Sequence, residues 1–198
     1  MRTLFIIMIS SFFIHCSSKN DIYTTSTFSK NGIVQVVVEI PGGTNKKIEY
    51  NPKSKTFEID QRNGTDRIIP FLPYPANYGF IPSTISDISS GGDGDALDIL
   101  LLSESLPTSS IVEVIPIGML KLLDNKKFDY KIICIPNDPS KRIIDATTYD
   151  EFIGKYSEAK NIIESWFLHY DTGGDTLTSK GWGDEKEALQ EITKSLKH

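Results

Sequence analysis

The sequence predicts a single α+β domain that has a β-barrel body and two helices near its C-terminal end. Apolar runs with the length and β-branched content of strands fill residues 33–135, and a helical period appears only after residue 147. Many short strands followed by helices are typical of the α+β class. The length of 198 residues suits one domain with a sizeable core.

The expected strands are residues 33–40, 48–50, 56–60, 97–102, 111–123 and 130–135. The first ends at Pro41-Gly42-Gly43, and the second and third are joined by the turn residues 51–55. Four prolines between residues 70 and 82 remove donors for sheet hydrogen bonds. We therefore expect residues 70–90 to form a loop.

Two helices complete the predicted domain. Apolar residues at spacings of three and four define the buried face of the first, namely Phe152, Ile153, Tyr156, Ala159, Ile162, Ile163 and Trp166. Asp184 can cap the second. The apolar positions of that helix are Ala188, Leu189, Ile192 and Leu196.

The first residues have the pattern of an export signal. Arg2 precedes an apolar stretch, residues 4–14, that is too short to span a membrane. Cys16 ends this stretch and a polar run follows it, which resembles a bacterial lipoprotein signal. His15 departs from that pattern, because a small residue usually precedes the cysteine. A plain secretory signal and an uncleaved anchor are the alternatives.

This pattern sets the expected domain boundaries. Residues 1–16 are a signal peptide that ends at a lipidated Cys16, residues 17–30 are a polar tether, and the folded domain covers 31–198. The protein would then be exported, either periplasmic or held at a membrane only through its lipid anchor.

Charge and residue usage exclude several classes of function. The net charge of −5 and the pI near 5.2 argue against a nucleic-acid partner. A polyanionic substrate would need local cations or bound metal to offset this background. The histidines are scattered and do not have zinc-site spacing, and Cys134 in a strand-like run is expected to be buried.

The run Gly91-Gly92-Asp93-Gly94-Asp95-Ala96-Leu97-Asp98 carries the strongest functional signal. Carboxylates this close raise one another's pKa, and a divalent cation such as Mg²⁺ or Ca²⁺ removes that cost. An EF-hand would need other residues at Leu97 and Asp98 and flanking helices, and a calcium-binding nonapeptide repeat would need tandem copies. A plain acidic turn explains Gly94 but does not explain Asp98 beside a buried strand. We therefore favour a metal site.

A second acidic group lies downstream. Asp124 and Asp129 flank a short loop between two expected strands, and Lys131 shares a strand face with Asp129. Alone these residues would form a solvated hairpin tip, but together with the first group they could complete a multi-metal centre.

Upstream residues offer donors for an anionic ligand. Tyr74 and Tyr78 lie in a proline-framed loop, and their hydroxyls can donate to anionic oxygens. Arg67 is the nearest upstream guanidinium suited to a bidentate grip on phosphate.

Taken together, these motifs resemble the soluble family I inorganic pyrophosphatases. Asp93–Asp98 is similar to the family's signature, and Asp124, Asp129 and Lys131 match its Asp, four residues, Asp and x-Lys. Tyr74–Gly79 matches its Tyr-Pro-x-Asn-Tyr-Gly loop. Residues 37–41 resemble its first barrel strand and His169-Tyr170 its helix end, so the similarity runs from about residue 33 to 190.

The resemblance implies hydrolysis of diphosphate to two orthophosphates on a five-stranded closed barrel similar to an OB fold, in a homo-oligomer. It implies several Mg²⁺ ions, with Mn²⁺ or Zn²⁺ as substitutes, held by Asp93, Asp95, Asp98, Asp124 and Asp129. Asp95 would also act as the base for the attacking water. Arg67, Tyr78, Lys131 and Tyr170 would hold the phosphates, and Glu39 and Tyr74 would support the site. Most of the family is cytoplasmic, which is the alternative to export.

Four departures from the family pattern alter the expected site. Ala96 replaces the usual proline or glutamate. Glu49 stands where a phosphate-binding lysine is usual, and Lys47 on the same strand face is the expected substitute. Asp171 follows Tyr170 in place of a second lysine. Residues 60–67 align with an insertion, so we expect Arg67 rather than Arg62 to bind phosphate.

Two other functions remain open at this point. One is a metal-dependent phosphohydrolase that acts on another extracytoplasmic phosphate ester. The other is a non-catalytic barrel that binds phosphorylated ligands or cations.

Overall fold

The computed structural model describes residues 21–171 and 177–197. The expected signal peptide and the lipidation site at Cys16 therefore lie outside the described residues. Within the described ranges, no helix has the length and apolar character that crossing a membrane requires.

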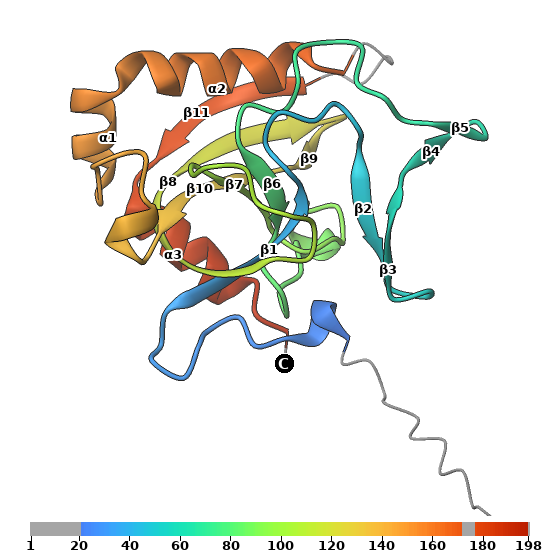
Figure 1. Ribbon diagram of the computed structural model, residues 1–198, viewed down its shortest axis with the longest axis horizontal. Helices are drawn as coiled ribbons and strands as arrows, with labels where there is room; N and C mark the ends of the chain where they lie inside the picture. The colour runs from blue at the N-terminus through green and yellow to red at the C-terminus, as the bar shows by residue number, and fades with distance from the viewer. Residues whose placement is uncertain (1–20, 172–176, 198) are drawn as a thin grey trace, which may run out of the picture.

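Five strands close into a ring, as the predicted barrel requires (Figure 1). They are β1 (Val34–Ile40), β6 (Asn77–Phe80), β7 (Asp98–Leu101), β10 (Lys131–Pro136) and β8 (Ile111–Asp124). The order is β1-β6-β7-β10-β8, and β8 pairs with β1 to close the ring. Only the β7–β10 pair among these is parallel. Closure removes exposed strand edges, which stabilises so short a set of strands.

Further strands extend the ring. β11 (Leu177–Gly183) and β9 (Lys127–Phe128) both pair with β8. Two hairpins, β2 (Ile48–Asn51) with β3 (Thr56–Ile59) and β4 (Gln61–Arg62) with β5 (Thr65–Asp66), project to one side of the ring (Figure 1).

Within residues 21–171 and 177–197, three α-helices rather than the expected two follow the ring strands. They are α1 (Tyr149–Lys155), α2 (Ser157–His169) and α3 (Glu185–Lys194), and short 3₁₀ turns lie at Ile22–Thr24, Ile88–Ser90 and Pro139–Lys141. The single helix predicted through Tyr156 breaks there, because Tyr156 has φ −132° and ψ 39°. The predicted cap of α3 is confirmed, since the Asp184 carboxylate accepts from Lys186 N–H and Glu187 N–H at 2.9 and 2.8 Å.

Alternating residues of the ring strands build the two larger of three apolar clusters. Leu100 of β7 packs in the cluster that contains Phe152 and Trp166 of the first two helices. Its neighbour Ile99 packs in the other, with Ile192 of α3. The two-residue period of a strand thus divides the core between the two sides of the sheet. Cys134 is buried in the second cluster, as predicted, and burial raises the pKa of its thiol.

The expectation of an unbroken loop over residues 70–90 is wrong at Asn77–Phe80, which form β6 in the middle of the sheet. Pro75 and Pro82 flank this strand instead of interrupting it, so no ladder donor is lost. Gly79 lets β6 approach β1 so closely that a Cβ there would lie 1.9 Å from the Val37 carbonyl oxygen.

The described part of the expected tether is packed on the domain, so residues 21–30 are not a free linker. Thr27 is buried and donates to the Pro82 carbonyl at 2.7 Å, and Phe28 pairs with Val34. The Tyr23 ring stacks on Tyr50. The apolar and aromatic residues of this segment are thus half-buried against the barrel, which a Ser/Thr-rich composition did not indicate.

Candidate functional site

A cavity of about 430 Å³ opens between the acidic loop, the turn that joins β8 to β10 and the residues in and around β2. Its carboxylates are Glu39, Glu49, Asp93, Asp95, Asp98, Asp124 and Asp129, its lysines are Lys47, Lys127 and Lys131, and its tyrosines are Tyr23, Tyr50, Tyr78 and Tyr170. Every carboxylate that the resemblance proposed as a metal ligand is in this set. Arg67 and Tyr74 are not among the described residues that line the cavity.

The acidic loop is built by local hydrogen bonds. The Asp93 side chain accepts from Asp95 N–H at 3.0 Å, and Gly94 has φ 95°, which favours glycine. The Ser86 N–H donates to the Asp95 carbonyl at 2.7 Å. These contacts leave the Asp95 side chain exposed, while Asp98 begins β7. Although Asp95 is exposed overall, partial burial of its carboxyl within the cavity, with help from Asp93 and Glu49, raises its pKa.

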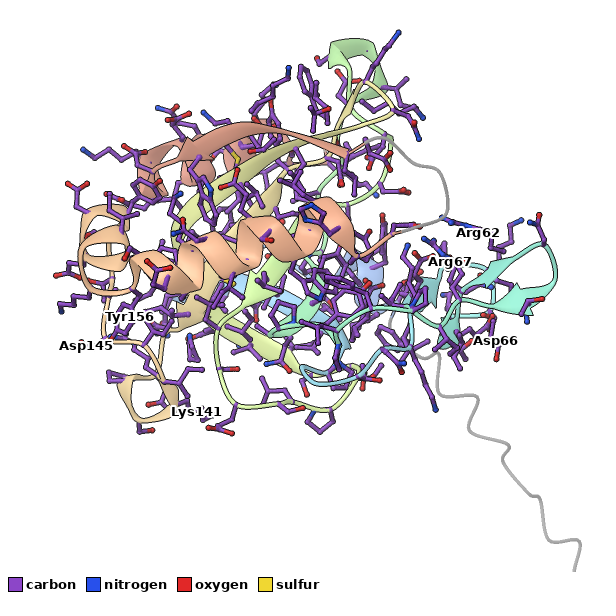
Figure 2. The ribbon with its side chains drawn as sticks, turned by 90° about the horizontal axis from the view of Figure 1, so that it is seen from above. Arg62, Asp66, Arg67, Lys141, Asp145 and Tyr156 are labelled. Carbon is purple, nitrogen blue, oxygen red and sulfur yellow. The ribbon has the colours of Figure 1, made fainter. Side chains whose placement is uncertain are left out.

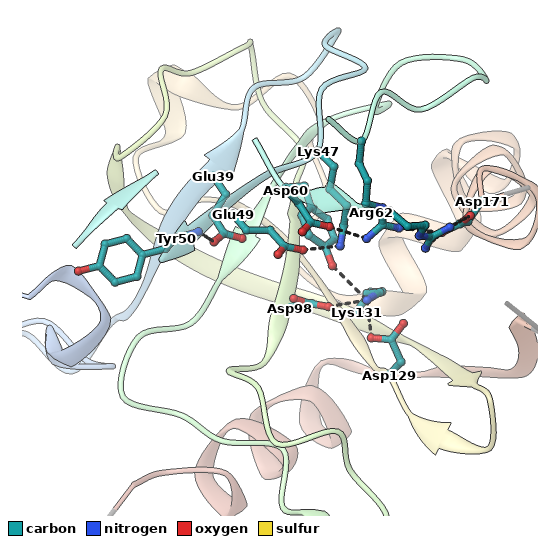
Figure 3. Close-up of polar contacts among 12 residues, drawn as sticks. Glu39, Lys47, Glu49, Tyr50, Asp60, Arg62, Asp98, Asp129, Lys131 and Asp171 are labelled. Carbon is teal, nitrogen blue, oxygen red and sulfur yellow. Dashed lines mark hydrogen bonds and ion pairs between the residues drawn. The ribbon is translucent and has the colours of Figure 1, made fainter. Parts of the chain in front are cut away.

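Lys131 joins the two acidic groups (Figure 3). The parallel register of β7 and β10 sets it opposite Asp98. Its ammonium lies 2.5 Å from a carboxylate oxygen of Asp98, 2.5 Å from one of Asp129 and 3.1 Å from the Tyr78 hydroxyl. The side chain is only 4% exposed. Burial works against its charge, but Asp129 and Asp98 outweigh burial and raise its pKa. Burial also disfavours the charged form of Asp98 and raises its pKa to about 6, although the Lys131 ammonium opposes this rise.

Glu39 forms part of the cavity wall from the end of β1. It is 8% exposed, and its side chain accepts from Tyr50 N–H at 2.7 Å. Burial raises the pKa of Glu39 to about 8, and Asp98 and Glu49 add to this rise. One contact of this carboxyl thus ties β2 to β1 beside the acidic groups.

The expected substitute lysine, which directly precedes β2, is engaged by a residue of that strand. Lys47 donates to the Glu49 carboxylate, two residues along, so the two side chains share a face as predicted (Figure 3). Lys47 lines the cavity, but Glu49 offsets its charge.

Tyr74 lies behind the cavity tyrosines. It is buried, and its ring centroid lies 5.4 Å from that of Tyr78, 6.3 Å from that of Tyr170 and 4.6 Å from that of Trp166. This packing fits the supporting role that the resemblance implied, because it fixes Tyr78 and Tyr170, two of the tyrosines that line the cavity.

Two arginines share one carboxylate. Figure 2 shows Arg62 and Arg67 on the same side of the molecule, and Figure 3 shows Arg62 beside Asp171. Arg62 forms a bidentate pair with Asp171, at 3.2 and 2.9 Å. Arg67 donates to Asp171 at 2.8 Å and to Asp60 at 2.7 Å. The structure therefore groups Arg62 with Arg67, and the sequence pattern did not reveal that Asp171 and Asp60 hold them.

The donor set fits a hard divalent cation. Among the described residues no three carboxylate, histidine or cysteine side chains form a complete ion cage in this conformation, and Lys131 lies between Asp98 and Asp129 instead. The cavity nevertheless presents many oxygen ligands, and crowding and burial raise the pKa of Asp95 and Asp98. A bound Mg²⁺ would remove that cost, as it prefers such oxygens.

The family model for inorganic pyrophosphatase matches residues 36–198. The chain belongs to the family I inorganic pyrophosphatases. It is 36% identical over 181 residues to the inorganic pyrophosphatase of Neisseria meningitidis serogroup A, covering 89% of this chain and 94% of that one. As a family I inorganic pyrophosphatase it is a metal-dependent inorganic diphosphatase.

Solved pyrophosphatase structures share its fold. That of Thermus thermophilus superimposes with a TM-score of 0.73 at 28% identity, over 89% of this chain and 97% of that chain. That of Neisseria gonorrhoeae has a TM-score of 0.67 at 34% identity, over 83% and 90%. The ring of five strands with C-terminal helices is thus the pyrophosphatase fold, and the family assignment favours diphosphate over the two alternative functions.

Proposed function

We propose that this pyrophosphatase hydrolyses diphosphate with Mg²⁺ in the acidic cavity, and that Asp95 takes the proton of the attacking water. One observation carries the proposal, namely the convergence of two separate acidic segments on one cavity that also contains lysines and tyrosines. The proposed metal ligands are Asp93, Asp95, Asp98, Asp124 and Asp129.

Metal chemistry explains why so many carboxylates are gathered. Bound divalent cations would shield the charge of diphosphate, lower the pKa of the attacking water and stabilise the leaving phosphate. Mg²⁺ suits an all-oxygen ligand set that keeps several waters, and Mn²⁺ or Zn²⁺ could replace it.

Support for Asp95 as the base comes from its surroundings. Its side chain is exposed in the cavity, while its backbone is tied to Ser86 and to the Asp93 side chain. A raised pKa makes a carboxylate a stronger base at neutral pH.

The phosphate groups would be held by donors from several separate parts of the chain. Lys131 donates to the Tyr78 hydroxyl as well as to Asp98 and Asp129, so the lysine and the tyrosine could approach one phosphate oxygen together once bound metal takes over the two carboxylates. We assign Tyr170, Lys47 and Arg67 to the remaining phosphate contacts, with Glu39 and Tyr74 as supporting residues. Positioning and electrostatics of this kind supply most of the catalysis in phosphoryl transfer.

A phosphate-release assay tests this proposal. We expect activity on diphosphate with Mg²⁺, little on nucleotides or sugar phosphates, and none in EDTA. Asp95→Asn should lower kcat by at least about 100-fold, the contribution of a general base, without lowering the melting temperature. Asp145→Asn, in an exposed position far from the cavity (Figure 2), is the control. Near-normal turnover of Asp95→Asn would refute the assigned base.

We also propose export with lipidation at Cys16. The support is the sequence alone: a basic residue, an apolar stretch, a cysteine and a polar run. Mass spectrometry of the native protein should find a mature chain that begins at a lipid-modified Cys16. An unmodified Met1 would contradict export.

A homo-oligomer is the last part of the proposal. Beyond the family resemblance, its support is the exposure of apolar side chains in one short segment, at Ile68, Phe71 and Leu72. Sedimentation velocity would show the state directly, and a monomer at micromolar concentration would contradict it.

A further inference from the structure

We propose that Tyr23, in the segment before the barrel, is a positioning residue that holds the acidic loop in shape for metal binding. The inference rests on the proposed function, because it takes Asp93–Asp98 to be a metal loop. It also gives a function to residues 21–30, which the sequence pattern predicted to be part of a tether.

The contact that carries the proposal joins Tyr23 to the middle of the acidic loop. The Ala96 N–H donates to the Tyr23 hydroxyl oxygen at 3.0 Å, across 73 residues of sequence. Tyr23 also lines the same cavity as the loop carboxylates. Its hydroxyl is therefore placed to fix the backbone between Asp95 and Asp98.

The Tyr23 ring is held firmly enough to act as a brace. It lies parallel to the Tyr50 ring, with 6.0 Å between centroids and an interplanar angle of 9°. Its centroid lies 5.1 Å from that of Phe80, and the Lys197 ammonium lies 4.4 Å from it. Aromatic and cation–π contacts of this kind restrict the ring.

The backbone around Tyr23 is also fixed. The Asp21 carboxylate accepts from Tyr23 N–H at 3.1 Å and from the Tyr50 hydroxyl at 2.7 Å. The Ser83 N–H donates to the Tyr23 carbonyl at 3.0 Å. Tyr23 is thus anchored through its backbone, its ring and its hydroxyl.

Three successive loop residues are held by three separate contacts. The Asp95 carbonyl accepts from Ser86 N–H at 2.7 Å, and Leu97 N–H donates to the Thr84 hydroxyl at 3.0 Å. Between them, Ala96 relies on Tyr23. Ala96 has more backbone freedom than proline, and a proline there would have no N–H to donate. The Tyr23 contact offsets this freedom.

Loss of the hydroxyl should therefore loosen the loop without touching a phosphate ligand. We expect Tyr23→Phe, which keeps the ring, to weaken Mn²⁺ and Mg²⁺ binding about 3- to 10-fold, the effect of one hydrogen bond. The KM for diphosphate at saturating Mg²⁺ should stay unchanged. The control is Tyr149→Phe, because Tyr149 begins α1 and its ring packs on Trp182 of β11.

The test measures metal binding directly. Calorimetric titration of the metal-free full chain with Mn²⁺ gives the affinity, and melting in EDTA reports any purely structural effect. Ala96→Pro removes the same hydrogen bond from its other side. In that background Tyr23→Phe should cause no further loss of affinity.

The outcomes separate the inference from the function on which it rests. The inference is supported if Tyr23→Phe weakens Mn²⁺ binding in the wild-type background but causes no further weakening in the Ala96→Pro background. Wild-type affinity in Tyr23→Phe, with or without a lower melting temperature, overturns it, as does a further loss of affinity in the double variant. Failure of the wild-type chain to bind Mn²⁺ or release phosphate would instead refute the proposed function.

Discussion

Arg67 donates to Asp171 at 2.8 Å, and the same carboxylate holds Arg62 in a bidentate pair. Asp171 thus stands where the resemblance expects a lysine, and under the proposed function it would compete with substrate for the Arg67 guanidinium. Its side chain is only 9% exposed, so water screens this competition weakly. The structure therefore predicts a site whose hold on phosphate is weakened by its own carboxylate.

Removal of that charge should tighten substrate binding. We expect Asp171→Asn to lower the KM for diphosphate about fivefold, or ~1 kcal/mol, because the arginines lose a competing anion. Initial rates against diphosphate at fixed free Mg²⁺ measure the change, with Asp145→Asn as the control. An unchanged or higher KM would show that Asp171 orients the arginines productively.

Lys131 should be needed for stability when metal is absent. Lys131→Met keeps the length of the side chain but leaves Asp98 and Asp129 facing each other without the ammonium between them. Loss of one partner from a buried ion pair costs about 3–5 kcal/mol of unfolding free energy. Urea denaturation in EDTA should show this loss, and Mg²⁺ should restore part of it by replacing the missing charge.

The matched control for that variant is Lys121→Met. Lys121 pairs with Glu187 near the surface, where an ion pair is worth at most about 1 kcal/mol. Equal losses in the two lysine variants would contradict a special role for the buried ammonium.

Glu39 should make stability fall as pH rises. Burial raises its pKa from 4.5 to about 8 in the folded chain, so between these values the folded state keeps a proton that the unfolded state releases. The free energy of unfolding then declines by up to ~1.4 kcal/mol per pH unit in this window. Glu39→Gln removes this titrating group, so the free energy of unfolding of the variant should decline less than that of wild type between pH 5 and 8.

Urea denaturation in EDTA at several pH values measures this difference in slope. Glu158→Gln, in an exposed position of α2, is the control and should follow the wild-type slope. Parallel slopes for Glu39→Gln and wild type would show that Glu39 is ionised in the folded chain.

Two glycines should respond in opposite directions to alanine. A Cβ at Gly79 would lie 1.9 Å from the Val37 carbonyl oxygen, so Gly79→Ala must push β6 away from β1 and should cost at least about 3 kcal/mol. A Cβ at Gly154, in α1, meets nothing within 4 Å. Gly154→Ala should stabilise the chain by about 0.5–1 kcal/mol. Thermal melting compares the two, and equal melting temperatures would contradict the close strand approach.

Local patterns in the sequence predicted most of the elements. The strand at Val34–Ile40 and the cap at Asp184 depend on neighbouring residues, whose spacing is legible in the chain. The strand at Asn77–Phe80 was missed because its prolines lie just outside it. The strand at Leu177–Gly183 was also missed, since it contains polar residues and glycines and depends on pairing with β8.

The candidate site divides in the same way. The carboxylates of the Asp93–Asp98 run stood out because they are adjacent in sequence, and Lys131 stood out because it lies two residues from Asp129. The contact of Lys131 with Asp98 instead requires the parallel pairing of β10 with β7. No local spacing reveals that pairing.

The sequence by itself thus determined the strand-rich barrel class, the family and the acidic residues of the cavity. Only the tertiary structure decided which distant groups meet: Arg62 with Asp171 across 109 residues, and Tyr23 with Ala96 across 73. The physical reason is range. Periodicity and motif spacing reflect interactions between residues that are close in sequence. The contacts of Arg62 with Asp171 and of Tyr23 with Ala96 form only after the strand ring has closed and brought remote segments together.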